Sequence, residues 1–476
     1  MANPNTIRDA MVNILPVEPF NSGKAPAPQE MYIPQAHKES LRLTSNLIIG
    51  ARGVGKSTWT AALADPKLRS IIGSNIRELE KIKVHIGFSE KGNTDAYPSQ
   101  ETFISLLEKN FHPYEVWQAV VSRWLRGETG EKIPDKTWEA SVLRAKNNPE
   151  SWERLLKKAN DMFSSNGSGG LIVFDALDRS GSTWKETNNI VRDLLRLVIR
   201  LKTYSNIHTK VFLREDQLPG NVIDFPDASK ILSTKTNLDW FFYDLHGLLW
   251  QLLCNANGEG GDALRGIYGE IVGSEPARKE NYWLISDDAK LDEKKQRRLF
   301  EKMAGPWMGK DPRRGVPYIW SVSHLADGKK RTSPRSFLAA IRAAAGASKN
   351  TGAEYPLHYE SIRYGVQKAS SIRVDEIAED YPWIRDLCES LKGINVPVEF
   401  AQVERVWNDK YPHGPADIKS ERLPPQNFDQ GWRGIKEELV RLGIFEEMRD
   451  GRINMPDLYR VGFKLGRKGG VTPLRK

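Results

Sequence analysis

The sequence predicts a mixed α/β fold built around a parallel sheet, and three observations support this class. Short apolar runs at 44–50, 171–174 and 210–213 have the length and composition of buried strands. Helix-like segments follow the first two runs, and apolar residues recur at helical spacing through 190–201. Strands that alternate with helices usually pair in parallel, because each helix returns the chain to the same end of the sheet.

Length and composition indicate a multidomain globular chain. With 476 residues, 39% of them hydrophobic and 28% charged, the chain is expected to form two to four domains at roughly 100–200 residues each. No apolar run approaches the ~18 residues of a membrane helix. The two cysteines, Cys254 and Cys388, are too few for a disulfide framework. Asp9 and Glu18 interrupt the first twenty residues, so no signal peptide is expected, and a reducing, cytoplasmic location is predicted.

Four regions are expected along the chain. They are an extended lead-in at 1–40, a P-loop ATPase core at 41–235, a helical lid with a basic segment at 236–350, and a winged-helix-like domain with a basic tail at 351–476. The lid includes a helix that starts at Ser333, with proline in its first turn, and stops at Gly346. Three helical patterns followed by a predicted hairpin at 444–455 give the order of a winged helix-turn-helix.

Positive charge is concentrated in one part of the lid. Residues 291–350 hold 14 Lys and Arg against five Asp and Glu, an excess of nine that equals the +9 of the whole chain. Such a segment suits phosphate chemistry or nucleic acid. A solvated basic face is the alternative interpretation.

The residues Gly50–Ser57 satisfy the pattern GxxxxGK[ST] between a predicted strand and a predicted helix. Glycines let backbone N–H groups surround the β- and γ-phosphates, and the helix start adds its positive end. Lys56 is expected to neutralise phosphate charge, and the Ser57 hydroxyl is expected to bind Mg²⁺. The predicted ATP-binding residues are Gly50, Arg52, Gly53, Val54, Gly55, Lys56, Ser57 and Thr58. Arg52 is expected to reach a phosphate, reach a neighbouring subunit, or point to solvent.

A second candidate lies at the end of the run 171–174, where Asp175 follows the last apolar residue. A carboxylate there, downstream of a P-loop, is expected to join Ser57 at the metal. The next residue is Ala176, where hydrolytic ATPases of this type often carry an acid. Asp178 is the nearest carboxylate, and it is expected either to orient the attacking water or to cap a turn.

These pieces in this order resemble the additional-strand P-loop ATPases of the AAA+ and STAND class. The segment 171–179 also resembles the Walker B segment of KAP-type bacterial NTPases. The resemblance covers roughly 30–345 and, more weakly, the winged-helix end. It implies ATP and Mg²⁺ as ligands and a nucleotide-driven switch.

Two arginines match sensor positions of these families. Arg214, which ends the strand after Asp175, matches the arginine that senses the γ-phosphate in STAND proteins; an ordinary surface arginine paired with Glu215 or Asp216 is the alternative. Arg335, at the start of a lid helix, matches the AAA+ lid sensor. An arginine is unfavourable at a helix N-terminus, which suggests an anionic partner. A solvent-exposed Arg335 is the alternative.

The resemblance implies an ATP-binding and ATP-hydrolysing switch, with a prokaryotic antiphage-defence ATPase as the preferred type. It would act as a homo-oligomer, with a separate effector protein, or both, since no effector domain or sensor repeat is recognisable. The alternative is a DNA-binding AAA+ ATPase of the initiator or transposition-helper type, with the winged helix on duplex DNA. Acidic and basic residues nearly balance on the predicted third helix and wing, which weakens phosphate attraction. A P-loop kinase is a third option, which the chain length and winged-helix end disfavour.

Overall fold

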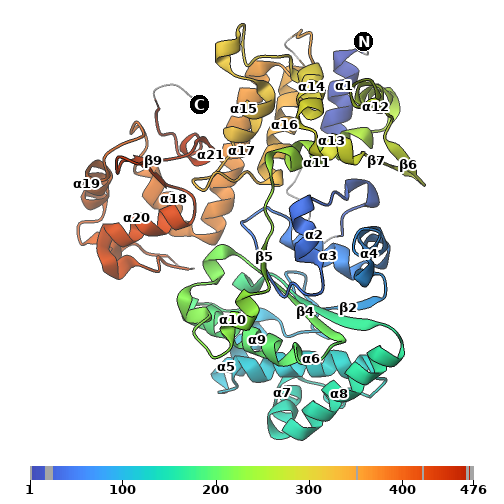
Figure 1. The fold of residues 1–476 in the computed structure, drawn as a ribbon. Coiled ribbons are helices and arrows are strands. Elements are labelled where there is room, and N and C mark those ends of the chain that lie inside the picture. Colours follow the sequence, from blue (N-terminus) through green and yellow to red (C-terminus); the bar gives the residue numbers. More distant parts are fainter. Residues whose placement is uncertain (1–2, 17–24, 350–351, 421–422, 468–470, 472–476) are drawn as a thin grey trace. The chain divides into compact units, whose positions relative to one another are not determined.

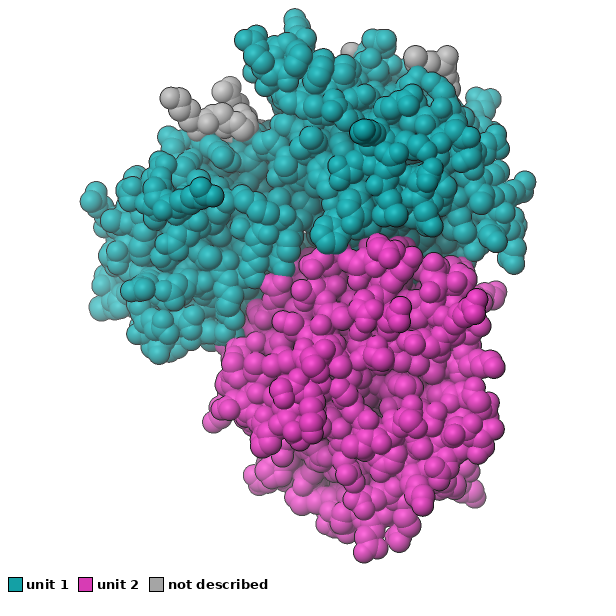
Figure 2. Space-filling model, in the orientation of Figure 1, with its two compact units in different colours: residues 1–20, 27–32, 240–476 teal, residues 21–26, 33–239 magenta. Residues whose placement is uncertain are grey.

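A computed structural model describes the chain except for residues 1–2, 17–24, 350–351, 421–422, 468–470 and 472–476. The chain divides into two compact units (Figure 2). The sheet unit comprises residues 21–26 and 33–239, and the helical unit comprises residues 1–20, 27–32 and 240–476. The end of the predicted basic tail lies outside the described residues. In the part that is described, no helix is long and apolar enough to cross a membrane.

The sheet unit contains a five-stranded sheet, which confirms the predicted α/β class (Figure 1). Its strands are β1 (Leu47–Ile49), β2 (Ile82–Phe88), β3 (Gly169–Phe174), β4 (Ile207–Leu213) and β5 (Lys235–Asn237). They run in the order β2-β3-β4-β1-β5, and every neighbouring pair is parallel. Strand β4 therefore lies between β1 and β3, which is the additional strand that the sequence resemblance implies.

Helices precede the first strand of this sheet and connect the others. They are α2 (Gln35–Leu41), α3 (Lys56–Ala64), α4 (Pro66–Gly73), α5 (Gln100–Glu108), α6 (Pro113–Glu128), α7 (Trp138–Asn147), α8 (Pro149–Ser165), α9 (Trp184–Leu201) and α10 (Ala228–Leu232). Helices α5 to α8 lie between β2 and β3 in the chain and are called the helical insert. The insert is tied to α9 because the buried Trp117 indole donates a hydrogen bond to the carbonyl of Ile190 at 3.0 Å.

The helical unit begins with α1 (Pro4–Ile14), so the lead-in is not extended there, contrary to expectation. Helix α1 buries Ile7 and Met11, a spacing of four residues that is too short a run to stand out in the sequence. Arg8, 2% exposed, donates to the carbonyls of Ala353, Tyr355 and Pro356 at 2.7–2.9 Å. A turn more than 300 residues away along the chain thus fixes this helix.

Most of the helical unit follows after Asp239, close to the predicted end of the core. Its first part contains α11 (Phe242–Cys254), α12 (Gly258–Val272), α13 (Asp287–Leu291), α14 (Glu293–Ala304), α15 (Pro317–Ser323), α16 (Pro334–Ser348) and α17 (Tyr359–Asp380), with a hairpin of β6 (Ala277–Lys279) and β7 (Tyr282–Leu284). Helix α16 is the helix predicted from Ser333, whose side chain accepts a hydrogen bond from the Ser336 N–H and so caps it.

The last part of the helical unit has winged-helix order, as predicted. It contains α18 (Pro382–Glu389), α19 (Phe400–Lys410), α20 (Gly431–Arg441), β8 (Glu446–Glu447), β9 (Ile453–Asn454) and α21 (Asp457–Arg460). Val398, between α18 and α19, forms a single antiparallel bridge with Ile453 of β9 in the β8–β9 hairpin. The wing is therefore anchored to the helices that precede it.

Candidate nucleotide site

The GxxxxGK[ST] motif forms a strand–loop–helix turn at the carboxyl end of β1. The Gly50 N–H donates to the carbonyl of Leu213 on β4 at 3.0 Å, so the loop starts beside the end of β4. Gly53 and Gly55 have φ of 80° and 103°, a region that disfavours other residues. A Cβ at Gly50 would lie 2.6 Å from the Val54 side chain. The glycines are therefore required by this loop shape, and α3 begins directly after it at Lys56.

Lys56 is held against the loop that precedes it. Its Nζ donates to the carbonyls of Gly50 and Ala51 at 3.0 and 2.9 Å. Burial lowers the pKa of Lys56 to about 8, while the carboxylate of Asp175 opposes that shift. A polyphosphate in the loop would stabilise the charged ammonium, because an opposite charge favours the ionised form.

The two predicted metal ligands are in contact. Asp175 ends β3 and is 2% exposed, and its carboxylate accepts a hydrogen bond from the Ser57 hydroxyl. Burial raises the pKa of Asp175, while the Ser57 hydrogen bond and the charge of Lys56 work in the opposite direction. A hydroxyl and one carboxylate are a set of oxygen ligands that suits Mg²⁺, which in such sites is completed by substrate phosphates and water. The residues present therefore fit the predicted ion.

The chain turns sharply after Asp175. Ala176 has φ 55° and ψ 33°, and a single 3₁₀ turn at Leu177–Arg179 follows. This turn places the Asp178 carboxylate 3.5 Å from Nη1 of Arg214. Asp178 thus lies next to the predicted sensor arginine.

Arg214 follows the last residue of β4 and is buried, so it is not a surface arginine. Its Nε and Nη2 donate to the Asp216 carboxylate at 3.1 and 2.7 Å, and its backbone N–H donates to Gln217 at 2.8 Å. Arg214 therefore joins two carboxylates, Asp178 and Asp216. Asp216 was expected only as a surface partner of Arg214. The spacing Arg-x-Asp directly after a buried strand is the signal that could have placed Asp216 at the site.

Arg335 has an anionic partner within its own unit. Its Nη1 donates to Glu376 of α17 at 2.7 Å, and Glu376 also accepts from Arg373 at 3.2 Å. Arg373 in turn donates to the hydroxyl of Tyr459 at 3.2 Å. The carboxylate of Glu376 thus meets the need for a negative charge near this helix start. Contact of Arg335 with a nucleotide remains a prediction.

The remaining predicted residues flank the loop. Arg52 and Val54 belong to the loop, and Thr58 belongs to the first turn of α3; Arg52 and Thr58 are half-buried. Backbone N–H groups in a first helical turn have no partner within the helix, and they suit phosphate oxygens. The roles of individual residues here remain predictions.

No protein-family model matches the chain, and no curated protein matches it significantly. Similar solved structures come from Aeropyrum pernix. The ORC2 protein in its ADPNP–ADP complexes is 14% identical, with 87% of this chain and 84% of that chain covered and a TM-score of 0.38. The ORC1 protein in complex with DNA is 14% identical, with 89% and 90% covered and a TM-score of 0.35. The ADP form of ORC2 is 15% identical, with 89% and 90% covered and a TM-score of 0.31. The fold class of this chain rests on its own strand order and loop geometry.

Proposed function

We propose that this protein binds and hydrolyses ATP with Mg²⁺ and uses the nucleotide as a switch. The observation that carries the proposal is the contact of Ser57 with Asp175 beside Lys56, at the end of a strand–loop–helix turn. The loop amides and Lys56 would hold the β- and γ-phosphates, and Ser57 and Asp175 would hold the ion. Bound Mg²⁺ would supply charge neutralisation on the phosphates.

Arg214 and Asp178 are the groups proposed to respond to the γ-phosphate. Arg214 is fixed through Nε and Nη2 by Asp216, so Nη1 is the edge that faces Asp178. A γ-phosphate that attracts Nη1 would compete with Asp178 for it. We propose that Asp178 then orients the attacking water, because position 176, where related ATPases often carry an acidic residue, is alanine here.

The finer proposal is an antiphage-defence ATPase of the AAA+/STAND type that assembles as an oligomer or with a separate effector. Its support is the resemblance of residues 171–179 to a KAP-type segment. Light-scattering mass measurement with and without ATP and Mg²⁺ tests the switch. A nucleotide-dependent increase in mass is expected, and an identical mass in both states at saturating ATP would argue against nucleotide-driven self-assembly.

The DNA-binding alternative gains no support from the winged-helix residues. Arg433 pairs with Glu437, Lys436 with Glu447 and Arg452 with Asp450, at 3.1, 3.3 and 2.7 Å. These carboxylates offset the cations that would contact phosphate. Duplex binding that weakens steeply with salt would nevertheless favour this alternative.

Replacing Asp178 with asparagine is expected to slow ATP turnover about 10²-fold or more while ATP affinity changes little, because a positioned acid or base contributes about that much. Steady-state turnover and equilibrium ATP binding are measured together. The matched control is Asp161→Asn, an exposed aspartate of α8 in the helical insert. If turnover is unchanged in Asp178→Asn, a group other than Asp178 orients the attacking water.

The depressed pKa of Lys56, about 8, predicts that ATP affinity falls as pH rises from 7.5 to 9.5. At a pH above the pKa of Lys56, the ligand-free lysine is neutral, so the binding of ATP must take up a proton. The Kd for ATP is therefore expected to rise by up to about tenfold per pH unit in this range. Calorimetry in two buffers of different ionisation enthalpy measures the proton uptake. The variant Lys56→Gln should show no such uptake. A lysine with an ordinary pKa near 10.4 would give a flat profile over this range.

A further inference from the structure

The places where the chain passes between the two units are fixed by contacts inside each unit. The chain enters the sheet unit after Tyr32 and leaves it again after Asp239. In the helical unit, the rings of Tyr32 and Trp240 stack with their centroids 6.1 Å apart, and the Tyr32 hydroxyl donates to the Asp244 carboxylate at 3.2 Å. In the sheet unit, His37 of α2 is hydrogen-bonded to the carbonyl of Asp239.

His37 is fully buried, and its two ring nitrogens have different partners. The Trp59 indole N–H lies 3.1 Å from Nδ1, and Nδ1 must accept because an indole N–H can only donate. Nε2 then carries the ring proton and donates it to the Asp239 carbonyl at 3.1 Å. Burial lowers the pKa of His37 to about 3, so the ring is neutral near pH 7. The two hydrogen bonds that join Trp59, His37 and Asp239 are called the histidine bridge.

The histidine bridge starts in the helix that follows the loop 50–57. Trp59 lies two residues after Ser57 in α3, and its side chain is 3% exposed. The strand before the loop reaches the same segment, because the Leu238 N–H donates to the carbonyl of Ile49 at 2.8 Å. Residues 238 and 239 are therefore hydrogen-bonded on both sides of the loop, directly to β1 and through the bridge to α3.

Helix α2, which carries His37, is itself fixed to the sheet. Lys210 of β4 is completely buried, and its ammonium donates to three backbone carbonyls at or just after the end of α2, those of Ser40, Arg42 and Ser45. The Ser40 hydroxyl donates to the carbonyl of Asn237 at 3.3 Å. Because α2 is held at its carboxyl end, a displacement of Trp59 is passed on to Asp239 instead of being absorbed by movement of α2.

We propose that the histidine bridge couples the nucleotide in the loop 50–57 to the segment through which the chain leaves the sheet unit. The inference rests on the proposed function, since ATP is the ligand that would act on the loop. Phosphates bound by the first-turn amides of α3 would restrict that turn, and Trp59 with it. The bridge then holds the Asp239 carbonyl more firmly, and the segment opens less often. By linkage, loss of the bridge should also weaken ATP binding.

Amide hydrogen exchange on the full chain, with and without saturating AMP-PNP and Mg²⁺, tests the coupling. In the wild type, AMP-PNP is expected to slow exchange at residues 238–240 about three- to tenfold, the effect of one net hydrogen bond on a local opening equilibrium. Trp59→Phe keeps an aromatic ring but removes the indole N–H, and most of the slowing should be lost. His37→Phe removes both hydrogen bonds and should give the same loss, and the double variant should lose no more than either single variant.

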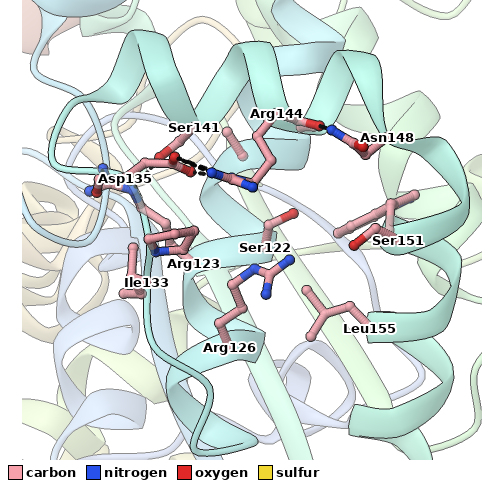
Figure 3. Close-up of a pocket in the computed structure, with 14 residues that line it drawn as sticks. Ser122, Arg123, Arg126, Ile133, Asp135, Ser141, Arg144, Asn148, Ser151 and Leu155 are labelled. Carbon is pink, nitrogen blue, oxygen red and sulfur yellow. Dashed lines mark hydrogen bonds and ion pairs between the residues drawn. The ribbon is translucent and has the colours of Figure 1, made fainter.

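Trp138→Phe is the matched control, because it removes one indole hydrogen bond elsewhere in the sheet unit. Its N–H donates to the carbonyl of Thr94 at 2.8 Å. This part of the helical insert has its own contacts, since Arg123 lies 4.1 Å from the Trp138 ring centroid and donates to the Asp135 carbonyl at 3.2 Å. Figure 3 shows Arg123 close to the ion pair of Asp135 with Arg144. The slowing at 238–240 should be retained in full in this variant.

Unchanged exchange at 238–240 in the wild type saturated with AMP-PNP would overturn the proposal without any variant. Full slowing in Trp59→Phe, or an equal loss of slowing in Trp138→Phe, would overturn it as well. Calorimetry measures the binding of AMP-PNP to each protein separately, so that every exchange measurement is made on the saturated form. Absence of binding to the wild type would reject the proposed function, and this inference with it.

Discussion

Replacing Lys56 with alanine is expected to abolish measurable ATP turnover and to weaken ATP binding strongly. The loop holds the Lys56 ammonium against the carbonyls of Gly50 and Ala51, at 3.0 and 2.9 Å. Loss of one preorganised electrostatic contact to a developing charge typically costs about 10²–10³ in rate. Without the positive charge of Lys56, the repulsion between the phosphates and the Asp175 carboxylate would be less well neutralised. Turnover assays and equilibrium binding of ATP measure the two effects separately.

The control for this variant must show that the loop still folds. Lys56→Arg keeps the charge but not the compact ammonium, and Lys67→Ala removes a lysine from the exposed start of α4 in the same unit. Thermal unfolding of all three should remain close to wild type. If Lys56→Ala binds and hydrolyses ATP as the wild type does, the nucleotide site is not in this loop and the proposed function is wrong.

Replacing Arg214 with alanine is expected to destabilise the sheet unit by about 3 kcal/mol or more, the usual cost of breaking a buried ion pair. The substitution leaves the carboxylates of Asp178 and Asp216, which now lie within 3.5 Å of the same guanidinium, without their shared cation. Urea unfolding followed by tryptophan fluorescence measures the change.

A double variant separates the charge effect from lost packing. Arg214→Ala/Asp216→Ala removes one of the two unpaired carboxylates and should recover part of the lost stability. Arg154→Ala breaks an ion pair with Glu150 whose side chains are 74% and 85% exposed, and it should cost roughly 0–0.5 kcal/mol. Equal losses for Arg214→Ala and Arg154→Ala would contradict the buried charge cluster.

Local sequence predicted the part of the site that depends on neighbouring residues. The loop from Gly50 to Ser57 needs glycines and a following helix, and both requirements are visible in eight residues. Asp175 was predictable because a fully apolar strand precedes it. The parallel sheet was predicted from the alternation of strands and helices, and the structure confirms it.

The contacts that depend on tertiary packing were not predictable. The position of Arg335 at a helix start predicted an anionic partner. That this partner is Glu376, 41 residues later, depends on how α16 packs on α17. The burial of Arg214 with Asp216 depends on what covers the end of β4.

The bonds of Arg8 have a consequence for how the chain is made. Its acceptor at Pro356 lies 348 residues later, which at about 5–20 residues per second corresponds to roughly 20–70 s of synthesis. During that interval the sheet unit can emerge from the ribosome and complete its parallel strands, while the apolar side of α1 waits for its partners. Helix α1 is therefore translated well before the residues that fix it, and its apolar side is exposed until they emerge.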